Sequence, residues 1–245
     1  MPRLVLIDAL NLIRRQHAAN SAQVVAACDG AWQRIAKALE PSHALAVFDG
    51  KAPSWRYQHF ADYKAGRSPM PEDLVPRLGD IATTWQKSGL KSWFPEAEEA
   101  DDLIASTALA ARSHNVAVAV VSTDKGYAQL LDAGVVQYDP FGRQFLGAEH
   151  WQQKLGISPS QLTDYLALTG DSTNAVPGVS GVGAKTAAQL LGQYRHLADI
   201  LASEADDKAV LKVKADAKAA LLAKTLATLR GDLPLPFGLS DLRRG

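Results

Sequence analysis

Residues 4–8 read Leu-Val-Leu-Ile-Asp, which is four aliphatic side chains followed at once by a carboxylate. Two further aliphatic runs occur at residues 44–48 and 116–121. Short unbroken runs of this kind are typical of parallel strands that are covered on both faces. Between the runs, residues 22–39 and 101–112 carry apolar side chains three and four apart, as amphipathic helices do. Alternating strands and helices predict an α/β fold, with a central parallel sheet flanked by helices.

The strand signal stops near residue 150, and the rest of the chain has the pattern of helices. Ser158 and Pro159 form a helix-start signal and predict a helix over residues 160–168. Residues 205–229 predict one charged amphipathic helix, which Pro234 and Pro236 would end. We therefore expect an α/β domain over residues 1–150 and a helical region over residues 151–245.

Composition excludes several classes of protein. The 245 residues contain 26 Lys+Arg and 26 Asp+Glu, so the chain is not a polycation that binds nucleic acid through overall charge. The single cysteine, Cys28, excludes an internal disulfide framework and indicates a reducing compartment, so we expect a cytoplasmic protein. No apolar run approaches the roughly 20 residues of a membrane helix, and we expect no membrane association.

Each predicted strand is followed by a carboxylate. Asp8 and Asp49 come directly after the first two runs, and Asp124 comes three residues after the third. Because the carboxyl ends of parallel strands meet at one edge of a sheet, we expect these side chains to lie close together. Glu99 and Asp102 would share one face of a helix's first turn. A single acid after a strand is often only a helix cap, but acids converging from four places repel one another unless cations neutralise them.

The ligand chemistry of this edge points to hard metal ions. The acids offer only oxygen, and no set of His or Cys residues has the spacing of a metal site. Such ligands favour Mg²⁺ or Mn²⁺, and a carboxylate-rich two-metal site suits the cleavage of phosphate esters.

Six short blocks along the chain carry a resemblance. They contain Asp8, Asp49, Tyr63-Lys64-Ala65-Gly66-Arg67, Glu99-Ala100-Asp101-Asp102, Ser122-Thr123-Asp124-Lys125 and residues 177–185. In this order, over residues 1–200, they resemble the 5′ nuclease (flap endonuclease) family. The resemblance implies a metal-dependent enzyme that cleaves 5′ flaps or 5′ ends of branched DNA. It also implies a helix-hairpin-helix (H3TH) DNA-binding module after the α/β domain.

The resemblance further implies which residues bind metal. The first metal cluster, which is also the catalytic centre, would comprise Asp8, Asp49, Glu99, Asp101 and Asp102. The second cluster is matched only in part, by Asp124 and Asp171. Where the family usually has a further acid beside each of these two, this sequence has Gly126 and Asn174. Because Asn is a neutral ligand and Gly is none, we expect weaker binding of a second Mg²⁺.

A glycine-rich segment at residues 177–186 nearly spells a nucleotide-binding loop. The spacing fails by one residue, Ala184, and the segment follows a helix rather than a strand, so we expect no nucleotide cofactor. As a hairpin between helices it would instead approach a DNA phosphate through free backbone amides. The DNA-binding residues would be Gly181, Val182, Gly183, Ala184, Lys185 and Thr186. The resemblance implies a K⁺ ion held by the backbone carbonyls of Leu168, Thr169, Pro177, Val179 and Val182.

Residues 50–73 interleave cations with aromatic side chains, namely Lys51, Trp55, Arg56, Tyr57, Phe60, Tyr63, Lys64 and Arg67. Cations with stacking surfaces are what a single-stranded DNA end requires. By resemblance this segment is an arch over the active site, with Lys64 and Arg67 steering the scissile phosphate.

Two functions remain open from the sequence. One is an Mg²⁺-dependent 5′ flap endonuclease, and the other is a branched-DNA-binding protein of the same fold with weak or no catalysis. The intact acids of the first cluster favour the enzyme, since a mere binder has no need of crowded like charges. In either case we expect a monomer whose partner is branched or flapped double-stranded DNA.

Overall fold

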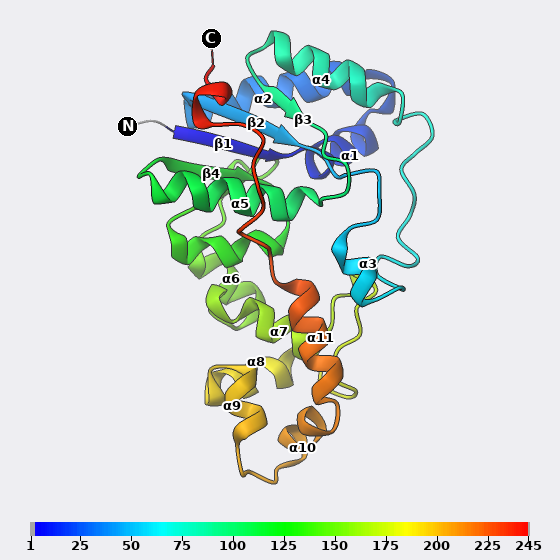
Figure 1. The fold of residues 1–245 in the computed structure, drawn as a ribbon, viewed down its shortest axis with the longest axis vertical. Coiled ribbons are helices and arrows are strands. Elements are labelled where there is room, and N and C mark those ends of the chain that lie inside the picture. The colour runs from blue at the N-terminus through cyan, green and yellow to red at the C-terminus, as the bar shows by residue number, and fades with distance from the viewer. Residues whose placement is uncertain (1–2, 245) are drawn as a thin grey trace. The chain divides into compact units, whose positions relative to one another are not determined.

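The computed structural model describes residues 3–244, which form two compact units (Figure 1). The first unit contains residues 3–54, 69–146 and 230–244, and the second contains residues 55–68 and 147–229. Both units are therefore discontinuous in the sequence. The expected division between residues 150 and 151 stays a prediction about domain organisation.

The first unit is built on a six-stranded sheet with the order β3-β2-β1-β4-β5-β6. Its strands are β1 (Arg3–Asp8), β2 (His43–Val47), β3 (Lys91–Trp93), β4 (Ala117–Val121), β5 (Val136–Asp139) and β6 (Gln144–Phe145). All neighbouring pairs are parallel except β5 and β6, so the sheet is mixed. The predicted α/β sheet is confirmed. The sequence pattern missed β3, β5 and β6, which are short and carry polar residues.

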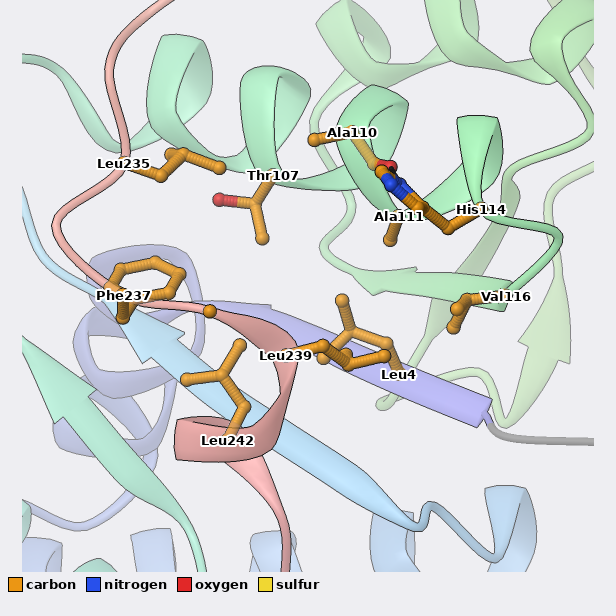
Figure 2. A pocket seen from close by; sticks show the side chains of 11 residues that line it. Leu4, Thr107, Ala110, Ala111, His114, Val116, Leu235, Phe237, Leu239 and Leu242 are labelled. Atoms are coloured by element: carbon orange, nitrogen blue, oxygen red, sulfur yellow. Dashed lines mark hydrogen bonds between the residues drawn. The ribbon is translucent and has the colours of Figure 1, made fainter.

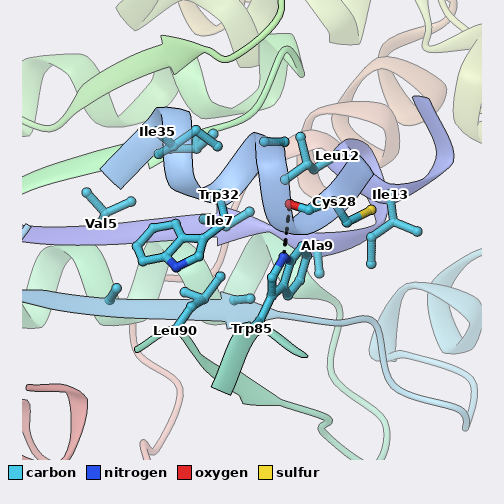
Figure 3. Close-up of a cluster of buried hydrophobic side chains, with 14 of the residues drawn as sticks. Val5, Ile7, Ala9, Leu12, Ile13, Cys28, Trp32, Ile35, Trp85 and Leu90 are labelled. Carbon is cyan, nitrogen blue, oxygen red and sulfur yellow. Dashed lines mark hydrogen bonds between the residues drawn. The ribbon is translucent and has the colours of Figure 1, made fainter. Parts of the chain in front are cut away.

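Helices cover both faces of this sheet (Figure 1). On one face, α1 (Ala9–Ala19), α2 (Val24–Leu39) and α4 (Arg77–Lys87) contribute to the main hydrophobic core. The core includes the fully buried Trp32 and Trp85, and the indole of Trp85 donates a 3.1 Å hydrogen bond to the carbonyl of Cys28 (Figure 3). On the other face, α5 (Ala100–Ser113) packs on β1 and β4. Short 3-10 turns lie at Ser21–Gln23, Lys125–Ala133 (η2) and Leu239–Leu242.

The C-terminal segment 230–244 returns to the first unit. The amide of Leu233 donates to the hydroxyl of Ser106, and the amide of Arg244 donates to the carbonyl of Ser42. Between this segment and α5 lies an apolar pocket of about 390 Å³ (Figure 2). It is lined by Leu4 near the start of β1, so it lies away from the strand's carboxyl end, where the acids are expected.

The second unit is helical. Its helices are α3 (Trp55–His59), α6 (Ala148–Leu155), α7 (Leu162–Thr169), α8 (Ala184–Tyr194), α9 (Leu197–Ala202), α10 (Lys208–Ala215) and α11 (Ala217–Ala227). The predicted start at Ser158 is confirmed, because Pro159–Gln161 forms a 3-10 turn that leads into α7 and the amide of Ser158 donates to the side chain of Gln161. Another short 3-10 turn lies at Ser172–Asn174 (η4).

The predicted single helix over residues 205–229 is wrong. The side chain of Asp207 accepts from the amides of Ala209 and Val210, so the first helix starts only at Lys208. The helix is interrupted at Asp216, whose backbone is not helical, and this residue separates α10 from α11. Within residues 3–244, no helix is both long and apolar enough to cross a membrane.

Candidate active site

The carboxyl edge of the sheet positions three of the predicted acids. Strands β2, β1 and β4 are neighbours, and Asp8 ends β1 while Asp49 and Asp124 follow β2 and β4. Asp8 also caps α1, since its Oδ1 accepts a 3.1 Å hydrogen bond from the amide of Asn11. Asp124 caps η2 in the same way through the amide of Gly126, at 2.7 Å. The same position therefore lets each of these acids cap a helix and lie at the carboxyl edge of the sheet. The interpretation as helix caps and the interpretation as metal ligands are compatible.

Helix α5 brings the second group of acids to the same edge. The amide of Ala100, its first residue, donates a 2.9 Å hydrogen bond to Oδ1 of Asp49. The loop before α5 lies against Gly50, whose amide donates to the carbonyl of Glu98 at 2.8 Å. A Cβ at Gly50 would stand 2.8 Å from the backbone of Ala97, so only glycine fits without displacing this loop. The close approach is what sets the start of α5 beside Asp49.

The acids of the first unit are close enough to perturb one another. Asp8 is 7% exposed, and its pKa is raised from 3.8 to about 7 by burial and by the negative charges of Asp49 and Asp124. The hydrogen bonds from Asn11 and Ser122 oppose this rise. Burial and neighbouring carboxylates thus disfavour the charged form of Asp8, and a cation bound among these acids would relieve their repulsion.

Specific donors hold the individual carboxylates. Oε1 of the buried Glu99 accepts from the hydroxyl of Ser54 at 2.7 Å. Oδ1 of the buried Asp102 accepts from the amide of Arg230 at 3.0 Å, which ties the C-terminal segment to α5.

Ser122 and Tyr127 are site residues that the sequence interpretation missed. The hydroxyl of Ser122 donates to Oδ2 of Asp8 at 3.1 Å. The phenol of Tyr127 donates to Oδ1 of Asp101 at 2.8 Å and lies 3.4 Å from Oδ2 of Asp8. Burial, together with the charges of Asp101, Asp8 and Asp124, raises the pKa of Tyr127 well above 10. The only signal in the sequence is their position within or beside the Ser-Thr-Asp-Lys block.

These residues fit a hard divalent cation by their donor chemistry. The edge gathers oxygen ligands alone, and the buried Asp8 is destabilised in its charged form without a neutralising partner. As the side chains stand, however, no three Asp, Glu, His or Cys residues within the described part of the chain form a group that could hold a metal ion. A cation would therefore have to draw the carboxylates together.

The second unit contains Asp171 and its neighbour Asn174. The amide of the Asn174 side chain donates to Oδ2 of Asp171 at 2.7 Å, so the residue that replaces the usual acid becomes a hydrogen-bond donor. The carbonyl of Asn174 accepts from the amide of Lys64 at 2.8 Å. Lys64 has a left-handed backbone, with φ of 59°, and its ammonium lies 5.3 Å from the Tyr63 ring centroid. Arg67 is exposed in the same unit.

The hairpin between α7 and α8 is tightly closed. Gly170 has a φ of 75°, and a Cβ at Gly178 would overlap the backbone of Gly170 and of Leu168. The carbonyl of Leu168 accepts from the amide of Val179, and the carbonyl of Val179 accepts from the amide of Val182. Several predicted K⁺ ligands thus lie together in one turn, and each carbonyl retains a second lone pair. The ion itself stays a prediction.

The part of the hairpin that the sequence predicts to bind DNA is largely open to solvent. Gly181, Gly183, Ala184 and Lys185 are exposed, whereas Val182 is buried. Gly183 precedes the first turn of α8, so the free amides of that turn begin at Ala184.

The arch prediction needs two corrections. Arg56 is buried, because its guanidinium donates to the carbonyls of Leu226 and Thr228 at the end of α11, so it is a helix cap rather than a surface cation. Tyr63 is 4% exposed and packs with Val176 and Leu226, which removes its ring from any stacking surface.

Comparisons with known proteins agree with this architecture. Residues 3–156 match the family model for a 5′-3′ exonuclease, N-terminal resolvase-like domain. Residues 157–245 match that for a 5′-3′ exonuclease, C-terminal SAM fold. The chain belongs to the 5′-3′ exonuclease family. The resemblance carried by the six sequence blocks is confirmed.

Individual members of the 5′-3′ exonuclease family are similar over nearly their whole length. The chain is 42% identical to flap endonuclease Xni of Tolumonas auensis, covering 99% of this chain and 98% of that protein. It is 40% identical to flap endonuclease Xni of Colwellia psychrerythraea, covering 98% and 91% of the two proteins.

Solved structures confirm the fold. T5 5′-exonuclease with bound divalent zinc ions superimposes with a TM-score of 0.81 at 20% identity, covering 92% of this chain and 89% of that one. The catalytic core of Rad2 in complex with DNA substrate gives a TM-score of 0.56 at 15% identity, covering 98% and 83%.

Proposed function

We propose that this protein is an Mg²⁺-dependent, structure-specific endonuclease that cleaves 5′ flaps or 5′ ends of branched DNA. The predicted class of enzyme, a DNA nuclease, is confirmed by the family and by its relatives named as flap endonucleases. The observation that carries the rest is the gathering of Asp8, Asp49, Asp101 and Asp124 at the carboxyl edge of one sheet, with a buried Asp8 that resists ionisation.

The residues of this edge have distinct tasks in such an enzyme. A bound Mg²⁺ would supply Lewis-acid chemistry, namely polarisation of the phosphate and activation of a water molecule. Asp8, Asp49 and Asp101 would supply its oxygen ligands, with Glu99 and Asp102 beside them. Ser54, Ser122 and the amide of Arg230 orient these carboxylates. In the second unit, Lys64 and Arg67 would attract the phosphate, because both are cations placed by a turn with left-handed backbone at Lys64 and Gly66.

The decisive experiment is cleavage of a labelled 5′-flap DNA in Mg²⁺. Asp101→Ala should reduce cleavage by orders of magnitude, while flap binding in Ca²⁺ persists. Asp132→Asn, which removes an exposed charge from the same unit, is the matched control and should cleave normally. Flap binding by the wild-type protein without any cleavage in Mg²⁺ or Mn²⁺ would favour the alternative of a branched-DNA-binding protein.

The partial second cluster predicts a weakly bound second ion. Restoring Asp at both Gly126 and Asn174 should lower the Mg²⁺ concentration that gives half the maximal rate. The Gly126 change has room, although a Cβ there would stand 3.2 Å from Oδ1 of Asp124, which must shift slightly. An unchanged Mg²⁺ dependence would contradict this account of the depleted cluster.

We also propose that the hairpin binds duplex phosphates with the help of K⁺. Lys185→Ala should weaken binding to all DNA sequences equally and make the slope of log affinity against log salt shallower by about one unit or less. K⁺ should support tighter binding than Li⁺ at matched ionic strength. Fluorescence-anisotropy titration of a flap substrate without Mg²⁺ measures both effects, and equal affinities throughout would leave the hairpin as a packing element. A cytoplasmic location and a monomeric state remain part of this proposal.

A further inference from the structure

The sequence patterns assigned no function to Tyr127. It belongs to η2 and is 1% exposed, yet its hydroxyl is directed at the acidic edge rather than into the apolar core. The phenol has one proton. At 2.8 Å that proton goes mainly to Oδ1 of Asp101, while the 3.4 Å contact to Oδ2 of Asp8 is a weaker one.

The turn that carries Tyr127 is fixed by its own first residues. Asp124 caps η2 through the amide of Gly126, and the side chain of Gln137 donates to the carbonyl of Asp124 at 2.7 Å. Gly126 offers no side chain to the site. Tyr127, the residue after Gly126, brings a neutral donor to the acids and not another carboxylate.

The two acids that Tyr127 contacts come from different elements. Asp8 ends β1 and Asp101 lies in the first turn of α5, so no local backbone constraint sets the distance between their side chains. Because two ionised carboxylates repel each other, their side chains tend to rotate apart toward water. Asp8 is already held by the amide of Asn11 and the hydroxyl of Ser122, and the buried phenol of Tyr127 fixes the Asp101 carboxylate beside it.

We propose that Tyr127 is a positioning residue that holds Asp8 and Asp101 together so that they can bind a divalent cation. This inference rests on the metal-dependent function proposed above. An ionised carboxylate has about four lone-pair positions, so the phenol leaves others open to the cation. Partners that orient metal ligands in this way typically change metal affinity by about 10- to 100-fold when they are lost.

Tyr127→Phe tests the hydroxyl alone, because the ring that fills the buried space is retained. Mn²⁺ binding to the whole protein, measured by isothermal titration calorimetry without DNA, should weaken by about tenfold or more. Tyr138→Phe is the matched control, since Tyr138 is another buried tyrosine of the first unit, lies on β5 and packs its ring against that of Phe145. Its Mn²⁺ affinity should equal that of the wild type.

A second measurement separates positioning from stability. In 5′-flap cleavage, Tyr127→Phe should raise the Mn²⁺ concentration for half-maximal rate, and saturating Mn²⁺ should restore most of the rate. The loss of affinity should also depend on Asp101, so adding Tyr127→Phe to Asp101→Ala, which removes the acceptor of the phenol, should weaken Mn²⁺ binding much less than Tyr127→Phe does in the wild type.

Four results would overturn the inference. Wild-type Mn²⁺ affinity in Tyr127→Phe would remove the role of Tyr127 while leaving the proposed nuclease intact. An equal loss in Tyr138→Phe, or full additivity with Asp101→Ala, would indicate a general effect on the fold. Absence of Mn²⁺ binding and of cleavage in the wild type would overturn both the inference and the proposed function.

Discussion

Replacing Asp8 by Asn should stabilise the protein in the absence of metal. The pKa of Asp8 is about 7 in the folded chain against 3.8 as its ordinary value, because burial and the charges of Asp49 and Asp124 disfavour ionisation. A group whose pKa is raised by folding lowers the free energy of unfolding as the pH increases from about 4 to about 7. A difference of one pKa unit corresponds to about 1.4 kcal/mol. Above pH 7 the ionised Asp8 therefore lowers the free energy of unfolding by roughly 4 kcal/mol.

The amide cannot keep every bond of the carboxylate. Asp8 accepts from Asn11, Ser122 and Tyr127, whereas an Asn side chain offers a single acceptor oxygen. We assign about 1 to 2 kcal/mol to that loss. Asp8→Asn should therefore raise the free energy of unfolding by about 2 to 3 kcal/mol at pH 8, and by about zero at pH 5.

Urea denaturation in EDTA at both pH values measures this difference. Tryptophan fluorescence follows it, since Trp32 and Trp85 are fully buried in the core of the same unit. Asp132→Asn controls for the change in net charge. Mg²⁺ at 100 times its dissociation constant should roughly cancel the difference in stability at pH 8, because bound cation stabilises only a chain that retains its ligands, here by about 2.7 kcal/mol.

A specific result would refute this reasoning. If Asp8→Asn were destabilising by the same amount at pH 5 and pH 8, the carboxylate would not be under electrostatic stress in the folded chain. The acids at the sheet edge would then be capping residues, and the case for a cation site would lose its electrostatic support.

Three further outcomes test the local geometry. Gly50→Ala should displace the loop at Ala97 and destabilise the protein by about 1 to 3 kcal/mol, with a larger fall in flap cleavage than in flap binding. Gly178→Ala should cost at least about 3 kcal/mol in thermal unfolding and abolish duplex binding, because its Cβ overlaps backbone across the hairpin, whereas the exposed Gly183→Ala should be tolerated. Asp164→Ala should lower the free energy of unfolding, measured by urea denaturation, by only about 1 to 2 kcal/mol. The Asp164 carboxylate is buried, but its partners, Lys224 on α11 and His196 before α9, are partly exposed and can turn to water.

The sequence predicted the elements whose signal is local and strong. The three central strands are aliphatic runs because both of their faces are covered, and they occur where the runs predict. Strands β3 and β5 escaped prediction because β3 has only three residues and β5 carries polar residues, so neither has that signal. The division of residues 208–227 into α10 and α11 escaped because the charged helical pattern continues through Asp216.

Arg56 and Tyr63 show why a surface role is difficult to predict from residue type. Both belong to a segment rich in cations and aromatic rings, which is typical of nucleic-acid contacts. Their burial depends on α11, about 170 positions later in the chain for Arg56, which supplies both the carbonyls and the apolar contact. No local pattern carries that information.

The sequence by itself determined the α/β class, the strand ends that carry Asp8, Asp49 and Asp124, and the oxygen-only chemistry of the site, because each depends on residue type and short-range spacing. Only the tertiary structure decided which neutral groups hold these charges. The hydroxyls of Ser54, Ser122 and Tyr127 and the amide of Arg230 reach the acids from up to 128 positions away in the chain. Hydrogen-bond partners are selected by distance and direction in space, and these are fixed only when the sheet, α5 and the returning C-terminal segment pack together.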